Sequence, residues 1–169
     1  VAERLQDVGI QALSIHGRTR KQMYKGEADW TLIGDVKNNQ RMHIPIFGNG
    51  DISTVENVVE VKNKYGIDGV MIGRAAIGNP WIFNEIKHFL KTGNHLARPV
   101  IADRVDACKK HLEHSIEWKG KILGIAEMKR HYSNYFKGIP HFKDYRIKII
   151  TSECTDKIFE LLDEIKLKF

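Results

Sequence analysis

The sequence is poor in the features that would place it in several common classes of protein. Among its 169 residues are only two cysteines, Cys108 and Cys154, which are too few and too far apart for a disulfide framework or a Cys-x-x-Cys metal site. Apolar runs are short, as at residues 70–72, and none approaches the roughly 18 residues of a membrane-spanning helix. No Gly-x-Gly-x-x-Gly follows a predicted strand, which argues against a Rossmann dinucleotide site. We therefore expect a protein of the reducing cytoplasm with no metal site and no membrane partner.

What is present is typical of a globular protein. Hydrophobic residues make up 42% of the chain and charged residues 28%, with a formal net charge of +6, which excludes a disordered or low-complexity chain. The chain begins at Val1 inside a helical pattern, without an initiator Met or a signal peptide. The simplest interpretation is that it is a piece of a longer protein.

The first part of the sequence repeats a short apolar strand, a polar loop and an amphipathic helix. Strands are predicted at 10–16, 43–47 and 68–72, and Gly48–Asp51 is predicted to be a turn. Helices are predicted at 29–38, at 80–91, and from a capping box of Ser53 and Glu56 to Gly66. This spacing is typical of a parallel sheet, in either a (β/α)8 barrel or a doubly wound fold.

The sequence changes character after a linker at residues 93–99. Beyond it there is no strand pattern, and helices are predicted at 101–118, 122–136 and 151–167. We therefore expect two domains, an α/β domain at 1–95 and an all-α helical domain at 100–169.

Three strand ends carry the residues that could bind a ligand. His16 ends the first strand, Asn49, Gly50 and Asp51 follow the second, and Gly73 and Arg74 follow the third. Carboxyl ends of parallel strands meet at one edge, so these groups should converge, with Gly73 and Arg74 suited to a phosphate. Barrels often bind phosphate after strands seven and eight, which would place His16 on strand six. Taken singly, each motif also fits a structural role: a hydrogen-bonded His, a tight turn and a surface Arg.

A basic segment lies in the helical part. Between residues 119 and 148 there are eight Lys and Arg but only two acidic residues, so this segment carries a net charge equal to that of the whole chain. Such a cluster suits a phosphate backbone, and the aromatic residues between the cations could stack on unpaired bases. The helical spacing of Tyr132, Tyr135 and Phe136 instead favours packing in a core, and the cations could form a solvated face.

These motifs resemble those of the tRNA-dihydrouridine synthase family, in its bacterial branch. The resembling segments are LSIHGRTRKQMYKGEADW (13–30), PIFGNGDI (45–52), DGVMIGRAAIGNPWIF (68–83) and, more loosely, MKRHYSNYFKGIPHFKDYR (128–146). The resemblance implies the C-terminal portion of the family's fold. That portion contains about strands 6–8 of an FMN-binding TIM barrel, followed by a helical tRNA-binding domain.

The resemblance also implies an activity, the reduction of uridine in tRNA to 5,6-dihydrouridine with FMN as cofactor and NADPH as reductant. His16 would contact the flavin, Asn49, Gly50 and Asp51 would bind FMN, and Gly73 and Arg74 would bind its phosphate. Lys129, Arg130 and Arg146 would bind tRNA. The family's catalytic Cys belongs to the first half of the barrel, so neither cysteine here is catalytic. Full-length members are expected to be monomeric.

Two alternatives stay open. Another FMN-dependent TIM-barrel oxidoreductase would share the phosphate loops but lacks a basic helical domain. A truncated RNA-binding module without catalysis would need only residues 101–169. Under the interpretation as a synthase fragment, three strands cannot close an eight-stranded barrel, so residues 1–169 alone should be inactive and should aggregate, dimerise or bind FMN poorly.

Overall fold

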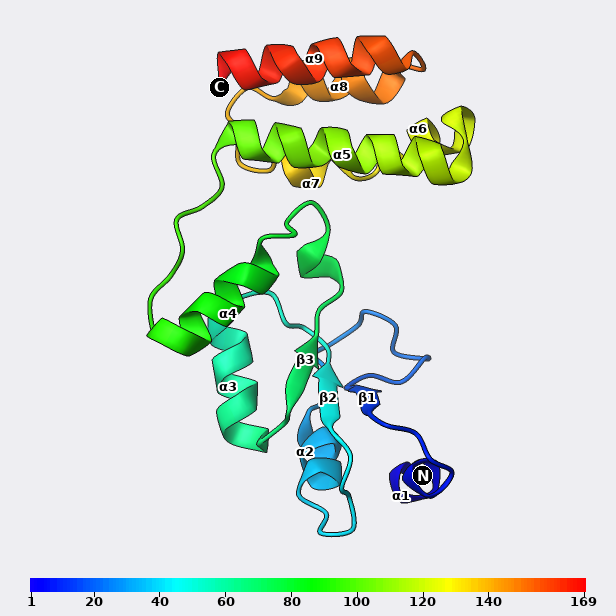
Figure 1. Cartoon of the computed structure of the whole chain (residues 1–169), viewed down its shortest axis with the longest axis vertical. Coiled ribbons are helices and arrows are strands. Elements are labelled where there is room, and N and C mark those ends of the chain that lie inside the picture. Colours follow the sequence, from blue (N-terminus) through cyan, green and yellow to red (C-terminus); the bar gives the residue numbers. More distant parts are fainter. The chain divides into compact units, whose positions relative to one another are not determined.

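The computed structural model describes residues 1–169, which divide into two compact units (Figure 1). The first unit comprises Val1–Ala76 and Ile82–His95, and the second comprises Ile77–Trp81 and Leu96–Phe169. Each unit is built around its own cluster of buried hydrophobic side chains. The short segment Ile77–Trp81 groups with the second unit although the chain returns to the first immediately after it.

The first unit is an α/β structure with a small parallel sheet. Its strands pair in the order β1-β2-β3, and α2, α3 and α4 follow one another in contact beside the sheet (Figure 1). The elements in chain order are α1 (Ala2–Asp7), β1 (Leu13–His16), α2 (Thr31–Lys37), β2 (Ile46–Asn49), α3 (Val55–Tyr65), β3 (Gly69–Met71), the 3-10 turn η1 (Arg74–Ala76) and α4 (Ile82–Thr92). The predicted α/β class and parallel sheet are therefore confirmed.

The sheet register aligns the three strand ends. His16 of β1 pairs with Asn49 of β2, which pairs with Met71 of β3. Side chains alternate between the two faces of a strand, so these three residues form one row on one face. At the opposite end of the sheet, the Asp68 carboxylate accepts hydrogen bonds from the Ile46 N–H at 2.7 Å and from Lys37 Nζ at 2.7 Å. The hydrogen bond from Ile46 and the neighbouring Lys37 lower the pKa of Asp68.

The second strand differs from its predicted position. The sequence predicts a strand at 43–47 and a turn at Gly48–Asp51, whereas β2 spans Ile46–Asn49 and includes Gly48 and Asn49. The N–H groups of His43 and Ile44 donate to Gln6 Oε1, at 2.7 and 3.3 Å, instead of to a neighbouring strand. A side chain 37 residues away thus delays the start of pairing, which no local pattern could reveal.

The predicted capping box at Ser53 and Glu56 is wrong by one residue. Thr54 is the N-cap of α3, and its hydroxyl accepts from the Asn57 N–H at 3.3 Å while Asn57 Oδ1 accepts from the Thr54 N–H at 3.2 Å. The helix ends as predicted at Gly66, whose φ of 67° is in the left-handed region that favours glycine.

The second unit is all helical, as predicted. Helices α5 and α6 form a close hairpin, α9 lies beside α5, and α8 contacts α7 and α9 (Figure 1). Their bounds are α5 (Ile101–Lys119), α6 (Lys121–Met128), α7 (Tyr132–Tyr135), α8 (Lys143–Thr151) and α9 (Thr155–Lys168). None of the helices in the structure is both long enough and apolar enough to cross a bilayer.

The helix predictions for this unit need two corrections. The predicted helix at 122–136 is two helices, α6 and α7, and α8 is a helix that the sequence analysis missed before α9. Tyr132, Tyr135 and Phe136 are buried in the core of this unit, so packing, rather than base stacking, accounts for them. Their large apolar rings supply much of the buried surface that holds these short helices together.

Candidate functional site

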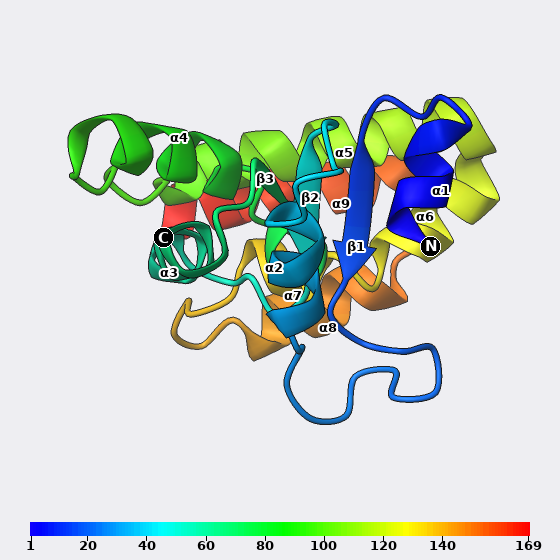
Figure 2. The ribbon, with the colours of Figure 1, turned by 90° about the horizontal axis from the view of Figure 1, so that it is seen from below.

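A single cavity of about 650 Å³ opens at the carboxyl end of the sheet. All six residues predicted to bind a cofactor line it: His16, Asn49, Gly50, Asp51, Gly73 and Arg74. Tyr24, from the long loop between β1 and α2, lines the same cavity, and Figure 2 shows this loop extending beyond the end of β1. The volume is within the range of small-molecule sites. The parallel register therefore brings together groups that lie up to 58 positions apart in the sequence.

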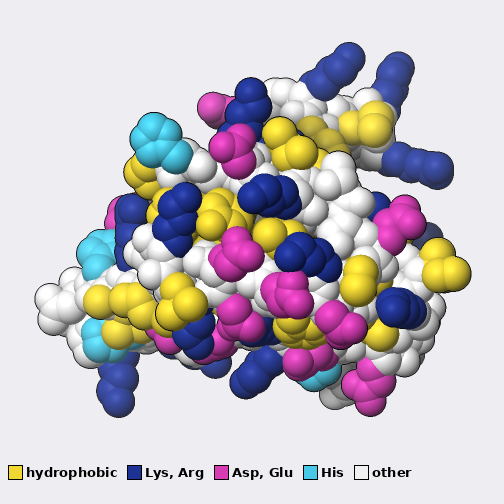
Figure 3. Space-filling model, turned by 90° about the horizontal axis from the view of Figure 1, so that it is seen from above, with side chains coloured by type: hydrophobic (Ala, Val, Ile, Leu, Met, Phe, Trp, Pro, Cys, Tyr) yellow, Lys and Arg dark blue, Asp and Glu magenta, His cyan; other side chains and the backbone are white.

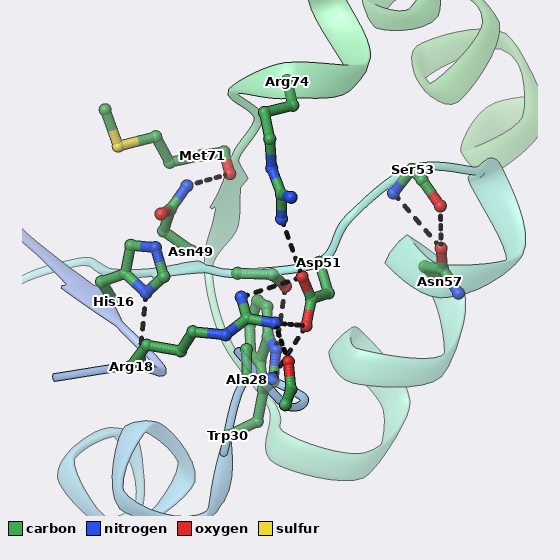
Figure 4. Close-up of polar contacts among 12 residues, drawn as sticks. His16, Arg18, Ala28, Trp30, Asn49, Asp51, Ser53, Asn57, Met71 and Arg74 are labelled. Atoms are coloured by element: carbon green, nitrogen blue, oxygen red, sulfur yellow. Dashed lines mark hydrogen bonds and ion pairs between the residues drawn. The ribbon is translucent and has the colours of Figure 1, made fainter. Parts of the chain in front are cut away.

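His16 and Asn49 have defined hydrogen-bonding roles at this site (Figure 4). His16 Nδ1 accepts from the Arg18 N–H at 3.0 Å, so the neutral ring carries its proton on Nε2. Asn49 Nδ2 donates to the Met71 carbonyl at 2.7 Å, which fixes the amide and leaves its oxygen as the acceptor for another group. The site thus offers a ring N–H donor and an amide acceptor in neighbouring positions of the sheet.

Asp51 lies at the centre of a charged network (Figure 4). Its carboxylate accepts from Arg18 Nη1 at 2.9 Å, Arg18 Nη2 at 2.5 Å, the Ala28 N–H at 2.8 Å and Arg74 Nη2 at 3.0 Å. The Arg18 side chain is only 4% exposed, whereas that of Arg74 is 57% exposed. Two guanidiniums therefore share one carboxylate, and one of them is buried.

The network favours the ionised form of Asp51. The hydrogen bonds from Arg18 lower its pKa most, and the Ala28 N–H and the charge of Arg74 act in the same direction, while partial burial opposes them. With two arginines and one carboxylate, the network keeps one net positive charge, and Arg74 is its exposed part. The site can consequently attract an anion to the Arg74 side of the cavity.

Two glycines shape the walls of the cavity. A Cβ on Gly50, whose φ is 135°, would lie 2.5 Å from the Cβ of Ala28, so a side chain there would push the loop away. A Cβ on Gly73 would meet nothing within 4 Å and would instead occupy open space. Gly73 thus leaves room for a ligand to approach the backbone beside Arg74.

Sequence reasoning missed three residues that organise this site. Arg18 holds Asp51, the Tyr24 ring lies 4.6 Å from the Arg74 guanidinium, and the Trp30 indole N–H donates to the Gly50 carbonyl at 3.1 Å. A signal for Arg18 existed, because an Arg directly after a strand needs an acidic partner and Asp51 follows the neighbouring strand. Nothing local marks Tyr24 or Trp30, since their partners lie 50 and 20 positions further along the chain.

The residues predicted to bind RNA lie in the second unit. Arg130 is exposed and lies 3.8 Å from Glu127, Arg146 is exposed on α8, and Lys129 is half-buried. The face in Figure 3 shows Lys and Arg interspersed with Asp and Glu, so cations do not dominate every side of the molecule.

Cys108 is buried, which raises the pKa of its thiol to about 12, and Cys154 is an exposed free thiol. No group of three or more His, Cys, Asp or Glu side chains is placed to hold a metal ion.

Comparison with protein families finds one model that matches nearly the whole chain. Residues 1–167 match the family described as "Dihydrouridine synthase (Dus)". The match covers both units and all six cavity residues that the sequence predicts to bind a cofactor.

Curated relatives agree with this match. A "tRNA-dihydrouridine synthase B" of Pseudomonas putida is 40% identical over 155 residues, which is 92% of this chain and 45% of the relative. A "Probable tRNA-dihydrouridine synthase" of Rickettsia conorii is 37% identical over 146 residues, covering 86% of this chain and 44% of the relative. A "Probable tRNA-dihydrouridine synthase 1" of Synechocystis is 37% identical over 163 residues, covering 96% and 45%. The chain therefore spans less than half the length of these relatives.

Proposed function

The chain belongs to the dihydrouridine synthase family, and from that premise we propose that it is part of a flavin-dependent oxidoreductase that converts uridine in tRNA to 5,6-dihydrouridine. In this proposal β1, β2 and β3 are about strands six to eight of a TIM barrel. The first unit corresponds to the C-terminal part of that barrel, and the helical unit binds tRNA. The catalytic acid is proposed to come from a part of the enzyme outside these 169 residues.

One observation carries the proposal. The six residues that sequence motifs assign to FMN all line a single cavity at the carboxyl end of a parallel sheet. Parallel topology alone brings strand ends together, so the support comes from the kinds of group that meet there: a ring N–H donor, an amide acceptor and an exposed cation around one cavity. This is the position at which parallel α/β folds bind their ligands.

The donors and acceptors in the cavity fit FMN. Arg74 and the open backbone at Gly73 suit a terminal phosphate, because a guanidinium and nearby N–H groups both favour an anion. His16 Nε2–H and the Asn49 amide oxygen suit the acceptor and donor groups of a flavin ring or its ribityl chain. Gly50 lets the backbone approach the ligand, and Asp51 is bonded to Arg74 beside it. When bound, the flavin supplies the hydride chemistry with NADPH as reductant, while these residues bind and orient it.

The helical unit suits the RNA. Lys129, Arg130 and Arg146 belong to the segment of residues 119–148, which contains eight Lys and Arg residues and only two acidic residues. Phosphate contacts by such cations position an RNA without reading its sequence. We propose that this unit holds the tRNA while the target uridine, unstacked from its neighbours, reaches the flavin site.

The test uses the protein that carries this sequence at its natural length, with FMN, NADPH and a tRNA transcript that lacks modifications. We expect dihydrouridine, measured as a mass increase of two hydrogens in the digested tRNA, and no reduction of free uracil. Reduction of the free pyrimidine would favour another FMN-dependent oxidoreductase. Salt-dependent tRNA binding without flavin binding or turnover would favour an RNA-binding module.

A variant links the activity to the cavity. Arg74→Ala removes a charge-assisted contact worth about 1.5–3 kcal/mol, so FMN affinity should fall roughly ten- to a hundredfold. Arg20→Ala is the matched control, because Arg20 is exposed and does not line the cavity. Equal FMN affinities for the two variants would contradict the assignment of the phosphate site. Flavin fluorescence titration measures both.

A further inference from the structure

Asp51 joins three segments of the first unit through one carboxylate. It contacts Arg18 at the start of the loop between β1 and α2, Ala28 near the end of that loop, and Arg74 after β3. A carboxylate has about four acceptor positions, and these four hydrogen bonds occupy them. Asp51 consequently has little capacity left to accept a hydrogen bond from a ligand.

The loop of residues 17–28, here called the clasped loop, closes on this carboxylate. Gly17 N–H donates to the Asn49 carbonyl at 2.8 Å, and Asp29 N–H donates to the Gly17 carbonyl at 2.7 Å, which closes the base of the loop. Arg18 Nη2 also donates to the Gly26 carbonyl, so the same guanidinium binds both Asp51 and the far side of the loop. The Arg18 side chain is 96% buried, and without the Asp51 charge it would be a buried cation lacking its counter-ion.

The backbone of Asp51 supports this role. Its φ is 53°, in the left-handed region, directly after Gly50 with a φ of 135°. Asp and Asn adopt this conformation more readily than most residues. The turn points the carboxylate away from the strand and into the three-segment junction drawn in Figure 4.

The clasped loop in turn places a ring beside Arg74. Tyr24, near the tip of the loop, stacks on the Arg74 guanidinium at 4.6 Å, while Asp51 Oδ1 accepts from Nη2 on the same group at 3.0 Å. Arg74 is therefore held between a carboxylate and an aromatic face at the edge of the cavity. Both contacts depend on Asp51, one directly and the other through the loop.

We propose that Asp51 is a positioning residue, which orders the clasped loop and aims Arg74 at the phosphate of the flavin without touching that phosphate. This proposal rests on the proposed function and changes the role assigned to Asp51 from the motif alone. A carboxylate beside a phosphate site is unfavourable by charge, so its presence needs such a compensating task.

The variant Asp51→Asn distinguishes a positioning role from a simple effect of charge, because the two predict opposite changes in FMN affinity. Asn keeps the shape and tolerates the left-handed backbone but cannot form ion pairs with two arginines. If charge alone mattered, FMN would bind more tightly, since a negative group has gone. If Asp51 positions Arg74, FMN should bind about tenfold more weakly while riboflavin, which lacks the phosphate, binds as before.

The apo protein gives a second readout. Lys21 and Lys25 lie in the clasped loop, and trypsin should cut there several times faster in Asp51→Asn than in the unaltered protein. Asp35→Asn is the matched control, an exposed residue of α2 with the same loss of charge. It should change neither flavin affinity nor loop cleavage. All measurements use the protein at its natural length.

The outcomes distinguish this proposal from the proposed function. If Arg74→Ala leaves the ratio of FMN to riboflavin affinity unchanged, the phosphate site itself is wrong. If Arg74→Ala lowers that ratio but Asp51→Asn leaves it unchanged or raises it, only the positioning role is overturned. Should Asp51→Asn fail to fold, Arg18→Lys keeps the charge but loses the two-pronged contact, and it should show the same selective loss in smaller degree.

Discussion

At the scale of single residues, Trp30 links the packing of the first unit to its candidate site. The indole is 6% exposed and fills the place where a side chain on Gly48 would lie, since a Cβ there would be 1.9 Å from a ring carbon. The same indole donates to the Gly50 carbonyl at the edge of the cavity. Gly48 is thus required by packing, whereas Gly73, with open space around it, is available for binding.

Replacing these two glycines by alanine should affect different properties, stability at Gly48 and FMN binding at Gly73. Gly48→Ala forces the indole out of place and should destabilise the protein by about 1–3 kcal/mol, as overpacked cores do. Gly73→Ala should change stability by less than about 0.5 kcal/mol but weaken FMN binding, because its methyl group enters the cavity. Urea unfolding and flavin titration measure the two effects, and a stable Gly48→Ala protein with an unshifted midpoint would refute the packing argument.

The residues of the site were predictable to the extent that they terminate strands. His16, Asn49 and Arg74 follow apolar runs at the spacing of parallel βα units, so their convergence follows from topology. Tyr24 was missed because its role arises from a folded loop whose partner is distant in sequence, whereas Arg18 could have been found from the acidic residue that follows the neighbouring strand. Periodicity reports which face a residue occupies, but not which distant group it meets.

At the scale of elements, the positions of most helices and strands were predictable, but most of their boundaries were not. The start of β2 depends on Gln6. The start of α3 depends on which of two adjacent hydroxyl residues, Ser53 or Thr54, caps the helix, and the structure shows that Thr54 accepts the N–H of Asn57. The short helix α7 and the missed α8 show the same limit. Helices of four and nine residues depend on tertiary packing for their stability, and their own propensities carry little signal.

The contact between α5 and α7 carries two histidines that should make the helical unit sensitive to acid. The His111 and His131 rings lie 5.0 Å apart, and His111 Nδ1 is 3.2 Å from the Tyr135 hydroxyl. Burial lowers the pKa of both rings, helped by the charge of His114 at His111, and by the other histidine and Arg130 at His131. Glu127 raises the pKa of His131 but does not outweigh these effects.

The sign of the pH dependence follows from these directions. Where the folded pKa is below the unfolded value of about 6.5, the unfolded chain binds more protons, so stability is complete above pH 6.5 and falls as the pH drops. The contribution of each ring should be small, because both rings are partly exposed to solvent. The variant His131→Asn should make the thermal unfolding midpoint depend less on pH between pH 7.5 and 5.5. The exposed control His141→Asn should leave this dependence unchanged. An identical slope in both variants would exclude this histidine pair as the cause.

At the scale of the whole molecule, the two units differ in how much unpaired strand edge and apolar surface they leave uncovered. The first unit leaves the outer edges of β1 and β3 without a neighbouring strand, and beside β3 lies an apolar cavity of about 340 Å³ lined by residues such as Phe47, Ile72 and Leu90. The second unit buries a complete core of its own. No local pattern groups Ile77–Trp81 with the helices, because the packing of Trp81 against the helical core is tertiary. This contrast is what we expect if the first unit is part of a barrel, as proposed above.

The uneven charge of the molecule supports a last prediction about RNA. The whole net charge of +6 is matched by residues 119–148 alone, so a polyanion should prefer that segment to the rest of the surface. Each cation that neutralises a phosphate contributes about 0.7–0.9 to the slope of log K against log salt. Replacing Lys129, Arg130 and Arg146 together by Ala should therefore lower the slope for tRNA by about 2 and weaken binding roughly ten- to a hundredfold near 150 mM salt. Replacing the α9 residues Lys157, Lys166 and Lys168 removes the same charge, but two of these lysines already pair with carboxylates of Glu160 and Asp106. That control should change the slope by less than 1. Filter binding across a salt series measures the slope for both triple variants. Equal losses of affinity would mean that net charge, and not this segment, holds the RNA.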